Sequence, residues 1–252
     1  MPDSVQEVRL HITGATGYLG SELARRSPGA SIERVEIRDE QALRTLFERV
    51  RPDVVLHTAY RQEGPDAWAV TVDGAENVAG AAAGVGARLV HLSTDVVFDG
   101  RKGAPYVEDD PPSPVTEYGR AKAEAEARVA AAHPDALLVR TSLIYGGTTP
   151  SKHEHAAFDP ANAFYTNERR SPVQVGDLAA ALLELAEQPL SGPLHVAGAD
   201  AVSRAELAEL IAGRPVATAL APLDRPLDCT LDSSLAGTLV RTRLRGVREV
   251  LV

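Results

Sequence analysis

Short apolar runs alternate with longer amphipathic stretches through the first 145 positions of the chain. The apolar runs are rich in Val, Ile and Leu, as is typical of parallel strands that are buried on both faces. They predict strands over residues 8–13, 35–37, 53–58, 88–93 and 136–141. The amphipathic stretches predict helices over residues 21–26, 41–50, 67–83 and 115–132. This alternation predicts an α/β fold with a doubly wound parallel Rossmann sheet.

The alternation stops after residue 145. Residues 146–170 contain many Gly, Thr, Pro, Asn and His with little periodicity, which predicts a long loop or lid. Further on, the pattern predicts a helix, a strand and a second helix over residues 177–188, 194–197 and 203–212, the last capped by Ser203 with Glu206 at the capping-box position. We therefore expect a Rossmann domain over residues 1–145, with 172–197 returning to it, and a small interleaved C-terminal lobe over 146–171 and 198–252.

Composition places the chain among globular proteins, with 44% hydrophobic and 24% charged residues. The net charge of −9 provides no basic field for nucleic acid or an anionic membrane. No apolar stretch approaches the roughly 20 residues of a bilayer span, and the start has no signal-peptide pattern. The single cysteine, Cys229, cannot form an internal disulfide, and no zinc-type spacing occurs, so we expect no metal. A cytoplasmic protein without nucleic-acid or membrane partners fits these features.

Three glycines, Gly14, Gly17 and Gly20, separate the first predicted strand from the first predicted helix. Without a Cβ, they let the backbone turn tightly and let a pyrophosphate approach the helix N-terminus. An ordinary glycine-rich turn has the same composition, but the position after an N-terminal strand favours dinucleotide binding. The spacing resembles that of the extended branch of the short-chain dehydrogenase/reductase superfamily.

A tyrosine and a lysine four residues apart, Tyr118 and Lys122, share one face of the predicted helix over 115–132. A nearby ammonium lowers the pKa of a phenol, so such a tyrosine can exchange a proton with a carbonyl or an alcohol. The pair alone is also typical of a solvated helix face. Thr94, however, follows a predicted strand at the edge where parallel strands line a ligand crevice, and its hydroxyl can orient a carbonyl there. Together the three residues predict a hydride-transfer site.

Several segments resemble the dTDP-4-dehydrorhamnose reductase family. They are Ser-Thr-Asp-Val-Val-Phe-Asp-Gly at 93–100, Tyr-Gly-Arg-Ala-Lys at 118–122, Arg-Thr-Ser-Leu-Ile-Tyr-Gly at 140–146 and the tail at 225–234. The resemblance covers most of the chain and implies reduction of the 4-keto group of a nucleotide-activated 6-deoxysugar by NADPH or NADH. It implies that Thr94 orients the ketone, that Tyr118 donates the proton, and that Lys122 supports both Tyr118 and the cofactor.

The resemblance also implies which residues touch each ligand. Those expected at the dinucleotide are Gly14, Thr16, Gly17, Tyr18, Leu19, Gly20, Glu36, Ile37, Thr58, Ala59, Tyr60, Tyr118 and Lys122. Those expected at the nucleotide sugar are Ser93, Thr94, Asp95, Val97 and Phe98. Arg169 and Arg170 are candidate diphosphate clamps, because guanidinium pairs bidentately with phosphate, although a solvated basic pair is the alternative. A homodimer stays open.

The chain departs from the family pattern at the second strand, at Thr71 and in the substrate lobe, where it has Leu143 and the segment 168–173. The span between Gly20 and Glu36 is too short for a full second strand, and it carries both acids and arginines, so NADH and NADPH both stay open. Thr71 stands where many extended members carry an asparagine that props the catalytic lysine through water. Two other functions therefore stay open: a non-catalytic NAD(P)-binding regulatory or partner-binding protein on this fold, and a nucleotide-sugar epimerase or dehydratase that recycles its cofactor.

Overall fold

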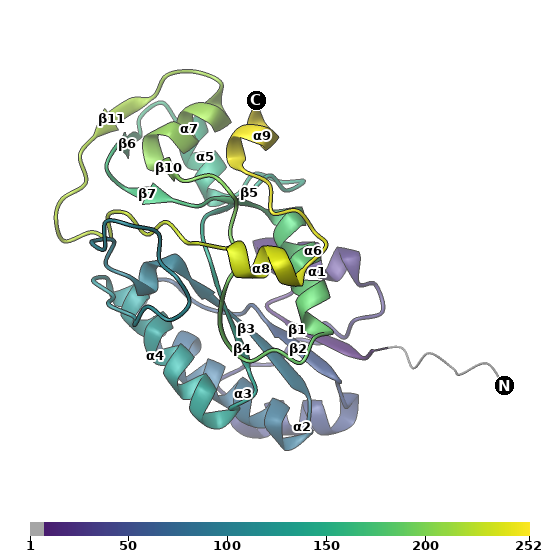
Figure 1. Cartoon of the computed structure of the whole chain (residues 1–252). Helices are drawn as coiled ribbons and strands as arrows, with labels where there is room; N and C mark the ends of the chain where they lie inside the picture. Colours follow the sequence, from purple (N-terminus) through teal and green to yellow (C-terminus); the bar gives the residue numbers. More distant parts are fainter. Residues whose placement is uncertain (1–7) are drawn as a thin grey trace.

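A central parallel sheet organises the computed structural model, which describes residues 8–252 (Figure 1). Its five strands follow the order β1-β2-β3-β4-β9, all in parallel register. They span Leu10–Thr13, Val54–His57, Arg88–Thr94, Leu137–Thr141 and Gly192–His195. The strands predicted at 8–13, 53–58, 88–93, 136–141 and 194–197 are thus confirmed, with small shifts at their ends.

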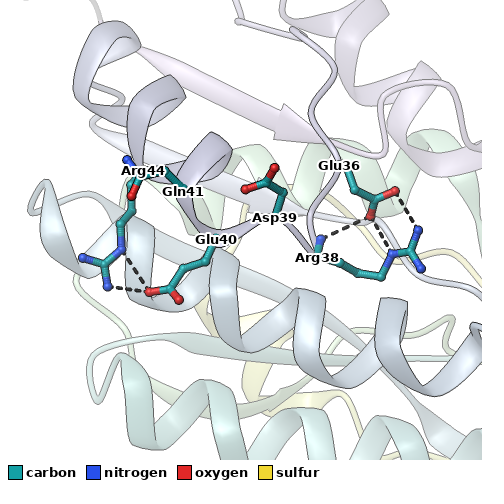
Figure 2. A pocket seen from close by; sticks show the side chains of 6 residues that line it. All are labelled: Glu36, Arg38, Asp39, Glu40, Gln41 and Arg44. Atoms are coloured by element: carbon teal, nitrogen blue, oxygen red, sulfur yellow. Dashed lines mark hydrogen bonds and ion pairs between the residues drawn. The ribbon is translucent and has the colours of Figure 1, made fainter.

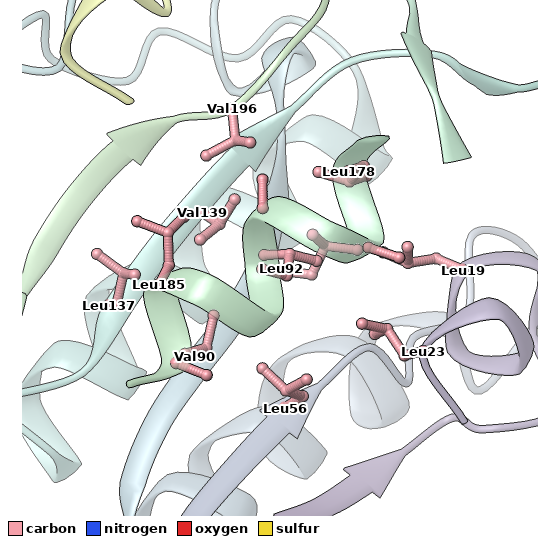
Figure 3. Packing of buried hydrophobic residues seen from close by; sticks show 14 of the residues in the cluster. Leu19, Leu23, Leu56, Val90, Leu92, Leu137, Val139, Leu178, Leu185 and Val196 are labelled. Atoms are coloured by element: carbon pink, nitrogen blue, oxygen red, sulfur yellow. The ribbon is translucent and has the colours of Figure 1, made fainter. Parts of the chain in front are cut away.

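Helices cover both faces of the sheet, which confirms the doubly wound α/β prediction. One face carries α1 (Tyr18–Arg26) and α6 (Val175–Ala186), and the other carries α2 (Glu40–Val50), α3 (Gly74–Gly84) and α4 (Glu117–Ala132). Figure 3 shows the core on the first face, where side chains of the two helices meet those of β2, β3 and β4. Its labelled members include Leu19, Leu23, Leu178, Leu185, Leu56, Val90 and Val139. Burying each such side chain stabilises the fold by about 1.5–3 kcal/mol.

The predicted strand at residues 35–37 is wrong. Only Ser31 pairs with the sheet, through an isolated bridge to His11 on β1. Residues 32–36 form no regular structure, and α2 follows almost at once, with the Asp39 side chain accepting a hydrogen bond from Ala42 N at 2.9 Å. The short span and its exposed charged side chains leave room for one bridge, since a full strand needs several paired residues and a buried face.

The predicted loop over residues 146–170 is also wrong, because three elements form within it. They are α5 (Lys152–Phe158), β6 (Ala163–Tyr165) and β7 (Arg169–Arg170). α5 begins at a capping box in which Ser151 accepts a hydrogen bond from Glu154 N and the Glu154 carboxylate accepts one from Ser151 N at 2.8 Å. The sequence motif Ser-x-x-Glu at residues 151–154 is typical of a helix N-terminus, so it indicates where α5 begins.

These elements join others in a layer beyond the sheet, which we call the cap (residues 151–170 and 202–219) (Figure 1). Its remaining members are β10 (Val202–Ser203), α7 (Arg204–Ala212) and β11 (Ala217–Ala219). β7 pairs with β10 and β6 with β11. Helices α5 and α7 lie side by side over a small core of Ala157, Phe164, Ala205 and Ala208. Ser203 caps α7 as predicted, accepting a hydrogen bond from Glu206 N at 3.0 Å.

Short elements complete the described chain. They are a π-helical segment (Ala69–Asp73), a 3-10 turn (Asp95–Val97), β5 (Ile144–Tyr145), β8 (Val173–Gln174), α8 (Ser234–Leu239) and α9 (Val247–Leu251). The predicted helix at 67–83 therefore contains a π-helical segment near its start. No helix within residues 8–252 has the length and apolar character to cross a bilayer.

Candidate functional site

A pocket of about 560 Å³ opens between the glycine turn and the ends of β1 and β2. Most residues expected at the dinucleotide line it: Gly14, Thr16, Gly17, Glu36, Ile37, Thr58, Ala59 and Tyr60. Three others lie elsewhere. Leu19 packs in the core, Gly20 supports the turn, and the Tyr18 hydroxyl accepts a hydrogen bond from Gly147 N at 2.7 Å. Tyr18 thus links α1 to the segment that leads into the cap.

Glycine is required at two positions of the turn. Gly14 has a φ of +70°, in the left-handed region, and a Cβ there would lie 2.7 Å from the backbone nitrogen of Ala59. A Cβ on Gly20 would lie 2.1 Å from the Gly14 carbonyl oxygen, so α1 approaches the turn only without a side chain. The pocket wall beside the N-terminus of α1 is therefore bare backbone, which fits the pyrophosphate of NAD or NADP.

A second, more open hollow of about 680 Å³ adjoins this pocket at Glu36 (Figure 2). Arg38 donates from Nε to Glu36 at 2.9 Å, while Arg44 donates from Nη2 to Glu40 at 2.6 Å. Hydrogen bonds from Arg38 lower the pKa of Glu36 to about 2, so the carboxylate stays charged at neutral pH. This end of the pocket thus offers both the acid that suits a ribose 2′-hydroxyl and a guanidinium that suits a 2′-phosphate.

The three candidate catalytic residues meet beside the pocket. Thr94 is the last residue of β3, while Tyr118 and Lys122 lie one turn apart on α4. The ring centroids of Tyr118 and Tyr60 are 5.7 Å apart, and Lys122 Nζ lies 5.4 Å from the Tyr60 centroid. The 3-10 turn Asp95–Val97, which follows Thr94, packs against α4. The structure therefore brings the predicted trio together at the mouth of the glycine-lined pocket.

Burial sets the protonation states of this trio. It raises the pKa of the Tyr118 phenol well above its ordinary value, and Tyr60 and Asp95 add to the rise. It also lowers the pKa of Lys122 to about 8, against the influence of Glu126. In the ligand-free protein desolvation therefore dominates, and the phenol of Tyr118 holds its proton. The ammonium of Lys122 instead donates a hydrogen bond to the carbonyl oxygen of Leu92 at 2.6 Å.

A buried ion pair holds α4 against the sheet. Arg140 on β4 donates from Nη2 to Glu126 on α4 at 2.9 Å, and both side chains are 5% exposed. The hydroxyl of Ser93 on β3 donates to the same carboxylate. Because Tyr118, Lys122 and Glu126 are spaced by four residues, they share one helix face. Anchoring Glu126 therefore fixes Tyr118 and Lys122 relative to the end of β3.

Four residues expected at the nucleotide sugar are buried behind the cleft wall: Ser93, Asp95, Val97 and Phe98. Val97 and Phe98 belong to a separate apolar cluster. The Asp95 carboxylate accepts a hydrogen bond from the Ser142 hydroxyl at 2.6 Å, and burial raises the pKa of Asp95. These side chains support Thr94 from behind.

The two candidate diphosphate clamps differ in accessibility. Arg170 is 2% exposed, and its Nη2 donates to the Glu168 carboxylate and to the Pro226 carbonyl, both at 2.8 Å. Its guanidinium is thus engaged by protein acceptors and is turned away from any ligand in this arrangement. Arg169 has 42% of its side chain exposed and donates to the Ala201 carbonyl at 2.9 Å.

Thr71 stabilises the loop after β2 instead of contacting the catalytic lysine. Its hydroxyl donates to the Arg61 carbonyl at 2.8 Å and accepts from Arg61 N at 3.1 Å. Arg61 follows Tyr60 directly, so this contact holds the ring that packs on Tyr118. The threonine lies in the π-helical segment, a feature common near functional sites.

Glu126 and Arg140, whose ion pair positions α4, are not among the site residues predicted from the sequence. Glu126 continues the four-residue spacing of Tyr118 and Lys122, and this signal could have located it. Arg140 carries no comparable local signal, because its partner lies on a helix distant in sequence.

The parallel sheet, the glycine-lined pocket and the adjacent Thr94, Tyr118 and Lys122 together define an NAD(P)-dependent oxidoreductase of the short-chain dehydrogenase type. The chain belongs to the family described by the RmlD substrate binding domain, whose model matches residues 8–249. The resemblance to dTDP-4-dehydrorhamnose reductases is thereby confirmed.

Known proteins of this family are similar along most of their length. The chain is 37% identical over 221 residues to the dTDP-4-dehydrorhamnose reductase of Mycolicibacterium smegmatis, which covers 79% of this chain and 67% of the relative. A dTDP-4-dehydrorhamnose reductase from Bacillus anthracis, solved with NADP, is 25% identical with a TM-score of 0.87, covering 98% of this chain and 97% of the other. A hypothetical dTDP-4-dehydrorhamnose reductase from Sulfolobus tokodaii is 29% identical with a TM-score of 0.82, covering 94% and 97%.

The anchoring role of the buried ion pair is testable by unfolding. Replacing Arg140 with Met leaves the Glu126 carboxylate buried without its partner, so we expect a loss of about 3–5 kcal/mol in the free energy of unfolding. The control is Arg44→Ala, because the Arg44–Glu40 pair is more than half exposed and removing it costs about 1 kcal/mol or less. Urea denaturation measures both. Equal, small losses would show that the pair does not anchor α4.

Proposed function

We propose that this protein reduces the 4-keto group of a nucleotide-activated 6-deoxysugar, with dTDP as the nucleotide and NADPH or NADH as the reductant. The observation that carries this proposal is the meeting of Thr94, Tyr118 and Lys122 beside the glycine-lined pocket. Two relatives support the ligand classes: one is a dTDP-4-dehydrorhamnose reductase, and another of that name is solved with NADP.

The two ligands would occupy different parts of the chain. We assign the dinucleotide to residues 1–145, to which 172–197 return, and the sugar nucleotide to a lobe of residues 146–171 and 198–252 that includes the cap. The position of the glycine-lined pocket supports the first assignment. The second rests on the rule that ligands of open α/β sheets bind outside the carboxyl ends of the strands. The reacting ketone would then lie between the two parts, next to Thr94.

Each residue of the trio has a distinct role in this reaction. A bound reduced nicotinamide supplies the hydride. Tyr118 holds its proton at neutral pH because burial keeps the pKa of the phenol high, and it donates that proton to the ketone oxygen. The Thr94 hydroxyl donates a hydrogen bond to the same oxygen and orients the carbonyl. Lys122 balances the charge of the tyrosinate that remains, and its ammonium would hold the ribose of a bound cofactor.

The central test removes one oxygen atom. Tyr118→Phe keeps the ring but has no proton to donate, so we expect kcat to fall by about 10²–10⁴-fold with cofactor affinity retained. The measurement is loss of reduced-cofactor absorbance with a panel of dTDP-4-ketosugars. Tyr145→Phe in β5 is the matched control and should keep the activity of the unchanged protein, because among residues 8–252 the Tyr145 hydroxyl has no hydrogen-bond partner.

Three outcomes would contradict the proposal. No turnover of any ketosugar by a protein that binds cofactor tightly would remove the reductase function. Full biological activity of Tyr118→Phe, together with a stable protein partner, would favour a regulatory protein on this fold. Turnover without net consumption of reduced cofactor would indicate an epimerase or dehydratase.

The depressed pKa of Lys122 predicts a pH dependence of cofactor binding. With a pKa of about 8 in the free protein, the side chain is charged below that pH and neutral above it. Since the cofactor ribose binds the charged form, affinity should be constant below pH 8 and fall by up to about tenfold per pH unit above it. Calorimetric titration with NADPH from pH 6.5 to 9.5 measures this. Lys122→Met should bind more weakly and with a flat profile; an identical slope in that variant would exclude Lys122 as the titrating group.

A further inference from the structure

Two cap residues, His153 on α5 and Arg204 on α7, are neighbours, and Arg204 carries a guanidinium. Arg204 is the first residue of α7, and its Nη1 lies 3.4 Å from His153 Nδ1. Both side chains are half-buried. The helices α5 and α7 that carry them pack together (Figure 1). Burial lowers the pKa of His153 to about 3, with Arg204 contributing, so the imidazole is neutral at pH 7 and brings no charge of its own. Arg204 therefore supplies the positive charge of this pair.

Two contacts connect this part of the cap to the neighbourhood of the catalytic trio. Lys152, next to His153, donates from Nζ to the side-chain oxygen of Gln62. Gln62 lies two residues after Tyr60, whose ring packs near Tyr118 and Lys122. The charge of Asp95, which follows Thr94, also acts on Arg204. Through Lys152 the cap thus contacts the loop that carries Tyr60, and Arg204 lies near enough to Asp95 to be influenced by its charge.

Arg204 lacks the counter-ion that its neighbours have. Among residues 8–252, no carboxylate oxygen lies within 4 Å of its guanidinium nitrogens. The nearby Glu168 is already bound by Arg170 at 2.8 Å and by Arg225 at 3.1 Å. Burial lowers the pKa of Arg204 although the charge of Glu168 raises it, and the charges of Arg170 and Arg225 lower it further. A half-buried guanidinium without a partner costs free energy that a bound anion would recover.

We propose that Arg204, assisted by Lys152, binds the diphosphate of the nucleotide-activated substrate. The inference rests on the proposed function and names a residue for its anionic subsite. The planar guanidinium can donate two parallel hydrogen bonds to phosphate oxygens, and the ammonium of Lys152 adds a second positive charge on the same wall. Arg204 thereby takes the role first expected of Arg170, whose guanidinium is saturated by protein acceptors.

The diphosphate of the substrate suits this position better than that of the cofactor. The cofactor pyrophosphate has its own cradle of bare backbone at Gly14 and Gly17, on the Rossmann side of the cleft. Arg204 and Lys152 both belong to the cap, on the opposite side. The two anionic ligands would thus bind to different groups of the protein. Because the net charge of the chain is −9, local donors and cations must hold both ligands.

The test is calorimetric titration of the full chain with dTDP and, separately, with NADPH. Arg204→Gln removes a charged donor, so we expect dTDP affinity to fall by about 10- to 100-fold while NADPH affinity stays unchanged. Arg204→Lys keeps the charge but loses the planar fork, so its affinity should lie between the two. The matched control is Arg214→Gln, an exposed arginine just beyond the other end of α7, which should bind both ligands normally.

Unchanged NADPH binding by Arg204→Gln also shows that the variant is folded. Equal dTDP affinity in Arg204→Gln and the unchanged protein would overturn the inference and leave the proposed function intact. A loss of NADPH affinity with dTDP affinity retained would also overturn it, by assigning the arginine to the cofactor. If the unchanged protein binds NADPH but neither dTDP nor UDP, the proposed function falls together with the inference.

Discussion

The buried ion pair between Glu126 and Arg140 is the constraint on which the site depends. It joins α4 to β4, and the Ser93 hydroxyl extends the contact to β3. A helix packed only by apolar contacts could slide or rotate by part of a turn, whereas a desolvated ion pair has one favourable geometry. Since Lys122 and Tyr118 precede Glu126 at four-residue intervals, this single anchor determines where both side chains point.

Burial also shifts the pKa values of the two catalytic side chains on α4, Tyr118 and Lys122. Desolvation raises the pKa of Tyr118 and lowers that of Lys122, so the phenol keeps its proton and the ammonium becomes easier to neutralise. Both shifts arise from water exclusion beside β3, and the ring of Tyr60 covers the two side chains. A reductase needs a protonated donor next to a dry carbonyl, and the neighbouring Tyr60 ring helps provide both.

The features that the sequence reveals are those encoded by local spacing. The glycine turn, the Tyr118–Lys122 pair and the strand that ends at Thr94 each depend on residues near one another in the chain, and the structure places all three as expected. Local spacing cannot predict contacts between residues that are far apart in the sequence. Residues 35–37 have strand-like composition, but the chain pairs with the edge strand β1 only at Ser31. Arg170 looks like a free cation until Glu168 and Pro226 surround it. Arg204 shows the reverse case: it has no ionic partner among residues 8–252, and only the folded cap reveals this.

In the proposed reaction, hydride passes to the sugar carbon while Tyr118 protonates the oxygen. The most direct measurement is isotope transfer from reduced cofactor carrying deuterium on the transferable position, with the sugar product examined by NMR. The account predicts one deuterium at C4 of the deoxysugar for each cofactor oxidised. A product without deuterium at C4, or deuterium transfer that proceeds at the same rate in Tyr118→Phe, would contradict it.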